Sequence, residues 1–364
     1  MSGLNRPLVL VLPVLIAGLA CEPLVTTFED MEGVTYYRAS SIKTVEAADS
    51  LVVVTWNIKY GGGGLDFWFD CWGERVLMTE KEVTENLDRV AAHIVQLDPD
   101  VLLLNEVEIS SRRSAYVDQV QYLLDATGLN YGVYASLWKS QFIPSDGIGR
   151  MDMGNAILSK YELSDGERIA LKLRSDQDAL TQYFYLHRNI LTAKVAAGTN
   201  SDLYAVVIHT AAFSQDGSKQ QHIDRFKEEL DRFAADGALF VGGGDLNTIP
   251  PNAETRIDFG DSKCTDDDFQ ADDYTNEADW LRPLYRDYYP AIDTLIYAAN
   301  DSAYFSHTTN SNGPFTRKLD YLFTNMGDGW VAGSGQVYNL AMGSGRKRLS
   351  DHAPVSAVLV VARR

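Results

Sequence analysis

The chain is poor in cysteine and in basic residues. Only three of its 364 residues are cysteine, Cys21, Cys71 and Cys264, and none belongs to a cysteine and histidine pattern typical of zinc sites. Lysine and arginine number 32 against 50 aspartates and glutamates, which gives a formal net charge of −18. Proteins that hold nucleic acid by its backbone normally carry a basic surface. The composition therefore disfavours long duplex DNA as a ligand, although the same acidity suits an exported protein that must stay soluble.

Long apolar runs are also missing, apart from one near the start. Residues 8–19, LVLVLPVLIAGL, follow Arg6 and are too short to span a membrane, so they predict a signal peptide over residues 1–20. Gly18-Leu19-Ala20 suits cleavage before Cys21, as in bacterial lipoproteins, although Gly18 stands where such sites usually carry a large aliphatic residue. We expect an exported protein, and favour a lipidated Cys21 that anchors it to a membrane, in the periplasm or at the cell surface, over plain secretion.

The rest of the chain is expected to form one domain behind a linker. Residues 21–50 lack sustained periodicity and predict a lipoprotein tether, with one short ordered piece near residues 34–37. The motifs described below extend through most of residues 51–364, which favours a single domain with surface insertions. If Cys21 carries lipid, Cys71 and Cys264 remain, and the sequence leaves open whether they form a disulfide.

Apolar periodicity predicts a mixed α/β protein. Apolar residues recur every three or four positions over residues 83–97, which indicates an amphipathic helix that ends at Asp98-Pro99-Asp100. Further helices are predicted over residues 115–126 and around residues 223–233. Strands are predicted at residues 51–55, 101–104, 156–159, 190–195, 204–209, 239–242, 321–324 and 355–361.

Five short motifs place polar side chains at or just beyond the ends of such strands. They are TWNIKYG from Thr55, NEVE from Asn105, IHT from Ile208, GDLN from Gly244 and SDHAP from Ser350. Together they supply Asn57, Glu106, His209, Asp245, Asn247, Asp351 and His352. Acids, amides and imidazoles at strand ends suit the binding of a hard divalent cation and the activation of water. The glycine run at residues 61–64 is no P-loop, because the lysine and hydroxyl residue of that motif do not follow, and it predicts a flexible turn beside the site.

In the order and setting of these motifs the chain resembles the endonuclease/exonuclease/phosphatase superfamily. Two more segments match strands of that family, MGNAILSKYEL from Met153 and RKLDYLF from Arg317. The resemblance spans residues 51–361 and implies a four-layer sandwich of two packed mixed β-sheets flanked by helices, with the active site at one edge. It also implies a catalytic domain in which water attacks a phosphate ester with the help of a metal ion. The resemblance does not identify the substrate.

Three residues are expected to hold the metal. Glu106 follows four apolar residues, and an acid there would be costly to bury without a cation or a donor beside it. The resemblance assigns Glu106 the same role. Asn57 and Asp351 would complete the oxygen environment, directly or through water. Mg²⁺ is the expected cofactor, because it keeps several waters and binds phosphate oxygens, and Mn²⁺ is a plausible substitute.

The remaining polar residues are expected to act on the substrate. His352 would be the general base, as a neutral imidazole oriented by Asp320. The resemblance implies that Asp245 and Asn247 point together at the nucleophile and a phosphoryl oxygen, and His209 would donate to a phosphate oxygen. Arg188 matches a position where some family members hold an arginine near the phosphate, and a surface ion pair is the alternative. His307 is placed at the substrate rim, whereas His93, His187 and His222 are interpreted as structural.

The favoured hypothesis is a phosphodiesterase whose substrate carries a single phosphate. A lipid headgroup or a small diester fits this description better than duplex DNA. The net charge predicts a mostly acidic flank around the pocket. Residues 261–299, rich in acidic and aromatic residues, are expected to be the substrate-specific insertion. The alternatives are a phosphomonoesterase of inositol-phosphate type, an extracellular nuclease and a non-catalytic binding lipoprotein. No pattern indicates a protein partner.

Overall fold

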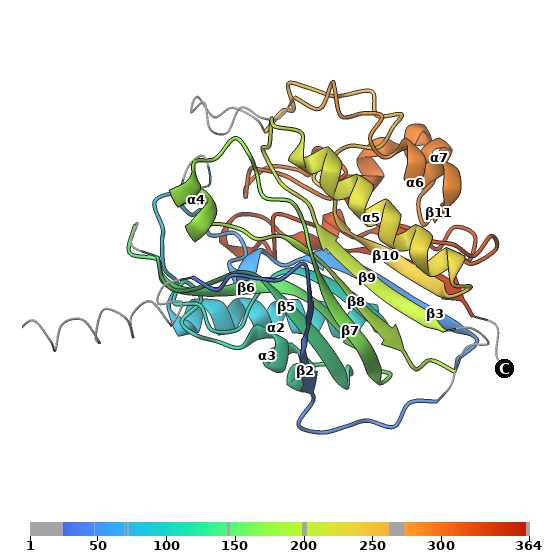
Figure 1. The fold of residues 1–364 in the computed structure, drawn as a ribbon, viewed down its shortest axis with the longest axis horizontal. Helices are drawn as coiled ribbons and strands as arrows, with labels where there is room; N and C mark the ends of the chain where they lie inside the picture. The colour runs from blue at the N-terminus through green and yellow to red at the C-terminus, as the bar shows by residue number, and fades with distance from the viewer. Residues whose placement is uncertain are drawn as a thin grey trace, which may run out of the picture.

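The chain folds around two β-sheets of seven strands each, as the computed structural model shows (Figure 1). The structure describes residues 25–46, 48–68, 70, 73–143, 146–198, 202–261 and 273–361. The predicted signal peptide and all three cysteines, with the predicted lipid anchor at Cys21, lie outside these residues.

Both sheets are mixed, because each contains one parallel pair among antiparallel ones. The first sheet runs in the order β13 (Gln336–Val337), β14 (Val355–Val360), β3 (Ser50–Asn57), β4 (Val101–Glu108), β6 (Gly149–Ser159), β5 (Tyr131–Ile143) and β2 (Thr35–Arg38). The second sheet runs in the order β1 (Met31–Gly33), β7 (Leu163–Ala170), β8 (Asn189–Val195), β9 (Leu203–His209), β10 (Leu239–Asp245), β12 (Asp320–Thr324) and β11 (Tyr289–Pro290). The parallel pairs are β3 with β4 and β9 with β10.

The sheets pack face to face, and helices cover their outer faces (Figure 1). Neighbouring residues of β3 point to opposite faces, so Val53 belongs to the core between the sheets while Val54 packs on the helix side. In the second sheet Val207 faces the core between the sheets and Ile208 faces the other way, toward α5. The predicted four-layer sandwich is therefore confirmed.

The helices are α2 (Glu80–Leu97), α3 (Gln119–Ala126), α4 (Ala179–Phe184), α5 (Ser218–Ala235), α6 (Arg282–Asp287) and α7 (Thr294–Ala299). Helix α2 starts in a capping box formed by Thr79 and Glu82, and it ends where Asp98 adopts a left-handed conformation. Helix α3 begins four residues later than predicted. Ala115 and Tyr116 have positive φ angles that interrupt a helix, and Asp118 caps the chain after them by accepting from the Gln121 amide. Among the described residues, none of these helices is both long and apolar enough to cross a membrane.

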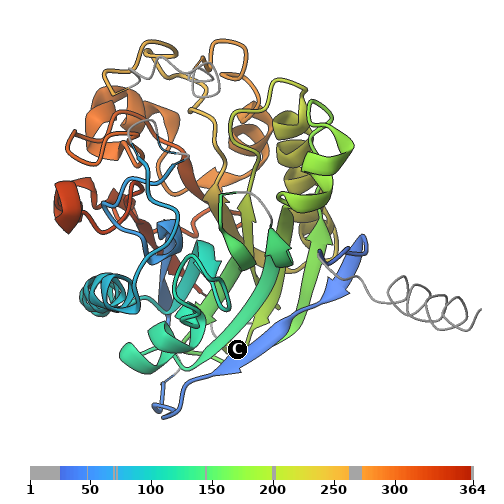
Figure 2. The same cartoon turned by 90° about the vertical axis from the view of Figure 1, so that its left-hand side faces the viewer.

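The predicted tether over residues 21–50 is wrong for the stretch that forms β1 and β2. Strand β1 pairs with β7 at the edge of one sheet, and β2 pairs with β5 at the edge of the other. Figure 2 shows this blue N-terminal stretch running along the edge of the sandwich. The ordered piece predicted near residues 34–37 corresponds to β2, and the folded domain begins well before residue 51. The pairing needs backbone groups rather than an apolar pattern, so periodicity could not reveal it.

Candidate active site

The predicted site residues come together where strands of both sheets end. In the register of the second sheet Asp245, the last residue of β10, lies opposite His209 of β9 and Asp320 of β12. In the first sheet Asn57 ends β3 and pairs with Asn105 of β4, which is followed by Glu106. The edge of the sandwich predicted from the resemblance is therefore the place where these side chains meet.

A cavity of about 260 Å³ opens at this edge. Seven of the predicted residues line it, namely Glu106, Arg188, His209, Asp245, Asn247, Asp351 and His352. Asn57 and Asp320 lie behind this lining and contact it through hydrogen bonds. Residues separated by almost the full length of the described chain therefore share one small pocket.

Glu106 is directed by an irregularity in its strand. The register of β4 with β6 shifts between Leu104 and Val107, and Glu106 has a φ angle of 56°. A β-bulge with a non-glycine residue in the left-handed region is locally unfavourable, and such features gather where a side chain must be aimed at a site. Burial raises the pKa of Glu106, and the nearby carboxylate of Asp351 raises it further.

Asn57 joins the two halves of the site. Its Nδ2 donates to Glu106 Oε1 at 3.1 Å and to Asp245 Oδ2 at 3.2 Å, while its Oδ1 accepts from the backbone N–H of Lys59 at 3.0 Å. In this arrangement the amide bridges two carboxylates. The prediction that Asn57 supplies an oxygen to a metal ion, directly or through water, stays a prediction, because its Oδ1 accepts one backbone hydrogen bond and keeps a second lone pair.

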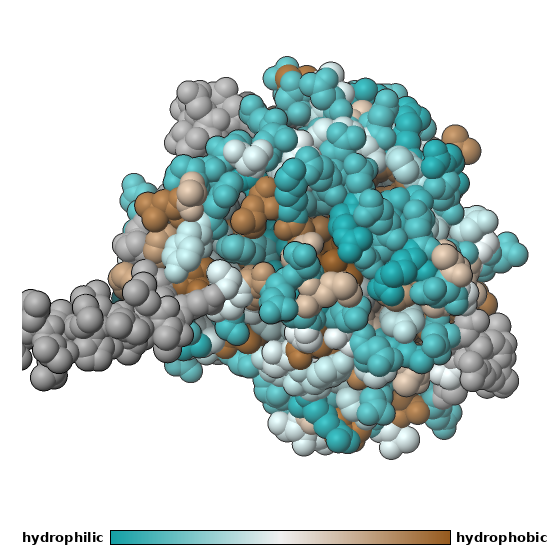
Figure 3. Space-filling model, in the orientation of Figure 1, coloured by the Kyte–Doolittle hydropathy of each residue, from teal (hydrophilic) through white to brown (hydrophobic). Residues whose placement is uncertain are grey.

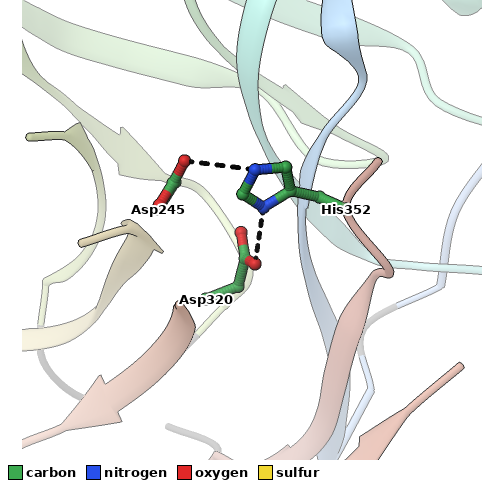
Figure 4. A group of neighbouring side chains, drawn as sticks. All are labelled: Asp245, Asp320 and His352. Atoms are coloured by element: carbon green, nitrogen blue, oxygen red, sulfur yellow. Dashed lines mark hydrogen bonds and ion pairs between the residues drawn. The ribbon is translucent and has the colours of Figure 1, made fainter. Parts of the chain in front are cut away.

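His352 lies between two carboxylates (Figure 4). Its Nδ1 is 2.8 Å from Asp320 Oδ2, and its Nε2 is 3.5 Å from Asp245 Oδ2. Burial lowers the pKa of His352, but Asp320 and Asp245 outweigh it and raise the pKa to about 10. The predicted pairing with Asp320 is present in the structure. The predicted neutral imidazole is not favoured, because two buried carboxylates stabilise the charged ring.

The pKa of Asp245 is also shifted, because Asp245 is buried beside His352. Burial raises the pKa of Asp245 to about 7, against the opposing charge of His352. Its Oδ1 accepts from the backbone N–H of Asn247 at 2.9 Å, so the turn of the GDLN motif orients the carboxylate. The Asn247 side chain donates to the Thr210 carbonyl at 3.1 Å, and its φ angle of 47° is left-handed. Asp245 and Asn247 thus lie on one tight turn, as predicted.

His209 and Arg188 form the opposite side of the pocket. His209 Nε2 is 3.4 Å from Asp245 Oδ2 and 3.9 Å from Glu106 Oε1. Burial, assisted by the positive charge of Arg188, holds the pKa of His209 well below its usual value, so the ring is neutral. Arg188 is 9% exposed and donates to the His209 carbonyl at 3.3 Å. No carboxylate of the described residues forms an ion pair with Arg188, which leaves a buried cation facing the pocket and argues against the surface ion pair.

The wall of the pocket carries charges of both signs, while the predicted acidic flank around the pocket stays a prediction. Seven lysines and arginines and six carboxylates line the cavity, beside the charged His352: Lys59, Arg113, Lys172, Arg174, Arg188, Lys219 and Arg348 against Asp66, Asp70, Glu106, Asp245, Asp261 and Asp351. The wall is therefore mixed, because much of the chain's acidity lies on other surfaces. Several of these cations are already paired with acids, such as Lys59 with Asp70 at 2.9 Å and Lys219 with Glu277 at 2.8 Å. A continuous basic stripe does not result.

Several residues that support the site were missed at the sequence level. Asn105 is fully buried, accepts from the Asp245 amide at 3.0 Å and donates to the Ile208 carbonyl at 3.1 Å, so it fastens one sheet to the other behind the site. Lys59 lies 3.6 Å from Asp351 and has a positive φ angle of 45°. Asn105 belongs to the NEVE motif and Lys59 to the TWNIKYG motif, so both could have been found from the sequence. In these motifs, roles are predicted only for Glu106 and Asn57.

His307 and the glycine run are more deeply placed than predicted. The His307 ring packs against His352 with ring centroids 4.4 Å apart, and burial keeps its pKa well below the usual value. It lies in the wall beside the catalytic candidates rather than at a rim. Gly61–Gly64 are buried, and a Cβ at Gly64 would lie 1.8 Å from the Gly345 carbonyl oxygen. The glycines permit a close approach of two backbone segments and are not a flexible loop.

The donor set fits a hard divalent cation on the Glu106 side of the pocket. The charge of Asp351 disfavours the ionised form of Glu106, and a cation bound beside Glu106 would offset this repulsion. A second group, Asp245, Asp320 and His352, also brings ligand-type atoms within 4.8 Å of one another. There a protonated His352 already bridges the two carboxylates, so we assign this group to proton handling and the Glu106 side to the metal.

Comparison with known proteins agrees with this geometry. Solved structures with the same fold include an endonuclease/exonuclease/phosphatase from Beutenbergia cavernae, with 19% identity, a TM-score of 0.51, and coverage of 86% of this chain and 72% of that chain. A functionally unknown conserved protein from Enterococcus faecalis has 15% identity, a TM-score of 0.52 and coverage of 85% and 100%. A family protein from Leptotrichia buccalis has 13% identity, a TM-score of 0.52 and coverage of 85% and 99%. No curated protein matches the sequence.

At these identities the solved structures establish the fold alone. The assignment comes from the sequence match, which extends over residues 54–352 and so includes each of the predicted catalytic and metal-binding residues. The chain belongs to the endonuclease/exonuclease/phosphatase family.

Proposed function

We propose that this protein is an exported Mg²⁺-dependent phosphodiesterase. The family consists of metal-dependent phosphoesterases and nucleases. The observation that carries the finer assignment is the convergence of Glu106, Asp245 and His352 on one cavity of about 260 Å³. A cavity of this size admits a single phosphate with a small substituent. Mn²⁺ is a possible substitute for Mg²⁺, since carboxylate oxygens serve both ions.

The residues divide the reaction between two sides of the pocket. Glu106 and Asp351 would hold the cation, which when bound neutralises phosphate charge and lowers the pKa of a coordinated water. Arg188 and His209 line the pocket beside Glu106 and Asp245, where they would hold the phosphate oxygens. In the proposed hydrolysis the water oxygen bonds to phosphorus while the bond to the leaving oxygen breaks. The water proton would pass to the Asp245 and His352 pair, which Asp320 orients from behind. The leaving oxygen keeps the electrons of the broken bond and departs as a phenolate or takes up a proton to leave as an alcohol.

A small diester or a lipid headgroup is the proposed substrate class. Duplex DNA would need a continuous basic surface to neutralise many phosphates. The cations of the pocket wall are interspersed with acids. Among the described residues, Arg188 and Arg348 are buried cations of this wall that form no ion pair with a carboxylate, and Arg348 donates to the carbonyls of Ser311 and Gly313. An inositol phosphate would likewise need several unpaired cations for its several phosphates.

Export and lipid anchoring at Cys21 are part of the same proposal. They rest on the apolar run at residues 8–19 and on the small residues before Cys21. A protein held at a membrane would meet lipid headgroups directly. Fractionation of cells with and without Cys21→Ser tests this point: wild type should partition with membranes and the variant should not.

A hydrolysis panel tests the activity. The purified protein with Mg²⁺ is offered bis-p-nitrophenyl phosphate, p-nitrophenyl phosphate, sphingomyelin, an inositol polyphosphate and plasmid DNA. We expect turnover of the small diester and of the lipid diester in preference to the monoesters and the plasmid. Preferred turnover of a monoester would establish the phosphatase alternative, rapid plasmid cleavage would establish a nuclease, and inactivity on every compound would support a binding lipoprotein.

A further inference from the structure

The catalytic pocket continues into a wall of apolar and aromatic side chains. Trp138, Ile148, Met153 and Leu186 line the same cavity as Glu106 and Asp245. Trp138, Ile148 and Met153 are buried. None of these side chains has a place in the hydrolysis proposed above, and none can bind a phosphate. The pocket therefore offers more surface than the phosphate needs, and that surface is apolar.

Three aromatic side chains stand at the outer part of this wall. Trp68, Tyr185 and Phe213, called here the aromatic mouth, line the cavity and are 42%, 37% and 40% exposed. They come from three separate segments: the loop after β3, the residues between α4 and β8, and the loop after β9. Large exposed aromatic rings that converge on one cavity are unusual unless they contact a ligand.

Phe213 is held in place by its neighbours. Its φ angle of 52° is left-handed, which disfavours a bulky residue. Arg174 donates to the carbonyls of Ala212 and Phe213 at 3.2 and 3.1 Å, and Ser175 Oγ donates to Asp216 at 2.8 Å. The loop that carries Phe213 is therefore pinned on both sides. A strained backbone that presents an exposed ring is typical of a binding position.

Tyr185 is fixed in a similar way. Its ring packs edge-on against Trp138 with centroids 5.5 Å apart, and Trp138 Nε1 donates to the Phe184 carbonyl at 2.7 Å. Apolar surface continues outward from here: in Figure 3 hydrophobic residues gather around the position of α4, which precedes Tyr185 and carries the exposed Leu180. Two of the three rings of the aromatic mouth, Phe213 and Tyr185, are thus held before a ligand binds, which lowers the cost of ordering them.

We propose that the aromatic mouth binds an uncharged aromatic group esterified to the phosphate, on the substituent that stays with phosphorus. The inference rests on the proposed diesterase function and names the substituent that this same site prefers. A flat ring can stack on the aromatic side chains that line this cavity, an attraction that aliphatic substituents lack. An acyl chain would gain apolar contact in the same place without stacking.

Three phosphodiesters with the same leaving group test the proposal: methyl p-nitrophenyl phosphate, hexyl p-nitrophenyl phosphate and phenyl p-nitrophenyl phosphate. The departing p-nitrophenolate is the same, so differences report the retained substituent. We expect kcat/KM for the phenyl ester to exceed that for the methyl ester at least tenfold, with the hexyl ester in between. Equal kcat/KM for methyl and phenyl would overturn the proposal while leaving the diesterase intact, and a hexyl ester that exceeds the phenyl ester would replace the aromatic group with an acyl chain.

Two variants and a matched control locate the effect. Phe213→Asn removes the ring and suits the left-handed backbone, and Trp68→Ala removes a second ring. Each should lower kcat/KM for the phenyl ester about fivefold or more and change that for the methyl ester less than twofold. Tyr116→Asn is the control, because Tyr116 is also an exposed ring with positive φ but does not line the cavity. Equal losses on both esters in variants with unchanged thermal unfolding would overturn the proposal, and hydrolysis of none of the esters would overturn the diesterase itself.

Discussion

At the scale of single residues, the site depends on how neighbouring groups fix one another's charge. His352 takes its position from Asp320 and its charge from two carboxylates, with distances of 2.8 and 3.5 Å from its ring nitrogens. His209 lies close by and is neutral. Two imidazoles in one pocket therefore have opposite protonation: burial, assisted by Arg188, lowers the pKa of His209, whereas Asp320 and Asp245 outweigh burial and raise the pKa of His352.

Asp320→Asn should separate orientation from charge at His352. The amide has the shape of the carboxylate, but it can no longer stabilise a protonated ring. We expect kcat to fall by roughly 10²-fold or more with little change in KM, since general acid and base groups contribute about that factor. Steady-state kinetics on bis-p-nitrophenyl phosphate measure this. A change in KM with kcat preserved would contradict the role of Asp320.

The buried His222 should make the protein less stable to unfolding in mild acid. Burial lowers the pKa of His222 to about 4, and the ring accepts from the Ala211 amide at 3.1 Å through Nδ1, so the folded state needs that nitrogen unprotonated. Unfolded histidine has a pKa near ~6.5, so the unfolded state binds more protons between these values and stability falls as pH falls. From pH 7 to pH 5 the expected loss is about 2 kcal/mol.

Urea unfolding of wild type and His222→Gln at several pH values checks this expectation. Glutamine does not titrate, so the variant should lose about 2 kcal/mol less than wild type between pH 7 and pH 5. Parallel pH dependence of the two proteins would assign the acid sensitivity to other groups.

From the sequence, the residue types of the site could be predicted, but the hydrogen bonds between these residues could not. Glu106, Asp245 and His352 could be recognised because each belongs to a short motif beside an apolar strand: Glu106 and Asp245 come after apolar runs, and His352 comes just before one. The bridging by Asn57 and the support by Asn105 depend on which atoms face one another across the two sheets. Such contacts join residues that are 188 and 140 positions apart, and no local pattern encodes them.

At the scale of secondary-structure elements, strands with clean apolar runs were predictable and the others were not. β3, β4, β9 and β10 contain apolar runs and start within one residue of their predicted starts, although β4 and β10 extend four and three residues beyond their predicted ends. β5 was missed, because YGVYASLWKSQFI mixes polar residues and a glycine although most of it is buried on both faces. β7 was missed because LSDGERIA contains a register shift between Ser164 and Glu167 that breaks alternation.

Helix α5 is fastened to the far side of the pocket by a buried ion pair. Lys219 Nζ contacts both carboxylate oxygens of Glu277 at 2.8 and 2.9 Å and donates to the Asn247 carbonyl at 2.8 Å. Lys219→Met leaves a buried carboxylate without its cation and should destabilise the protein by about 3–5 kcal/mol. The double variant Lys219→Met/Glu277→Leu should regain most of this loss. Chemical denaturation of the three proteins measures both steps, and a double variant as unstable as Lys219→Met would refute the pairing argument.

At the scale of the whole molecule, the N-terminal strands close the edges of both sheets. Three residues of β1 and four of β2 pair with β7 and β5. At about 0.2–1 kcal/mol for each cross-strand pair, a chain that starts at residue 39 should be about 1–7 kcal/mol less stable than one that starts at residue 25. Urea unfolding of the two truncated proteins compares them. Equal stability would show that residues 25–38 are dispensable, as the predicted tether implies.

The central claim is that Glu106 carries a divalent cation that the hydrolysis requires. The most direct measurement is a Mg²⁺ titration of bis-p-nitrophenyl phosphate hydrolysis for wild type and Glu106→Gln, together with the Mg²⁺-induced rise in thermal unfolding temperature. Glu85→Gln, at an exposed carboxylate of α2, is the control. Wild type and the control should show saturable activation, loss of at least about 100-fold on chelation, and a rise in unfolding temperature with Mg²⁺. Glu106→Gln should remain folded and lose all three responses. Hydrolysis that persists in the presence of a chelator, or a Glu106→Gln protein with the Mg²⁺ response of wild type, would contradict the account.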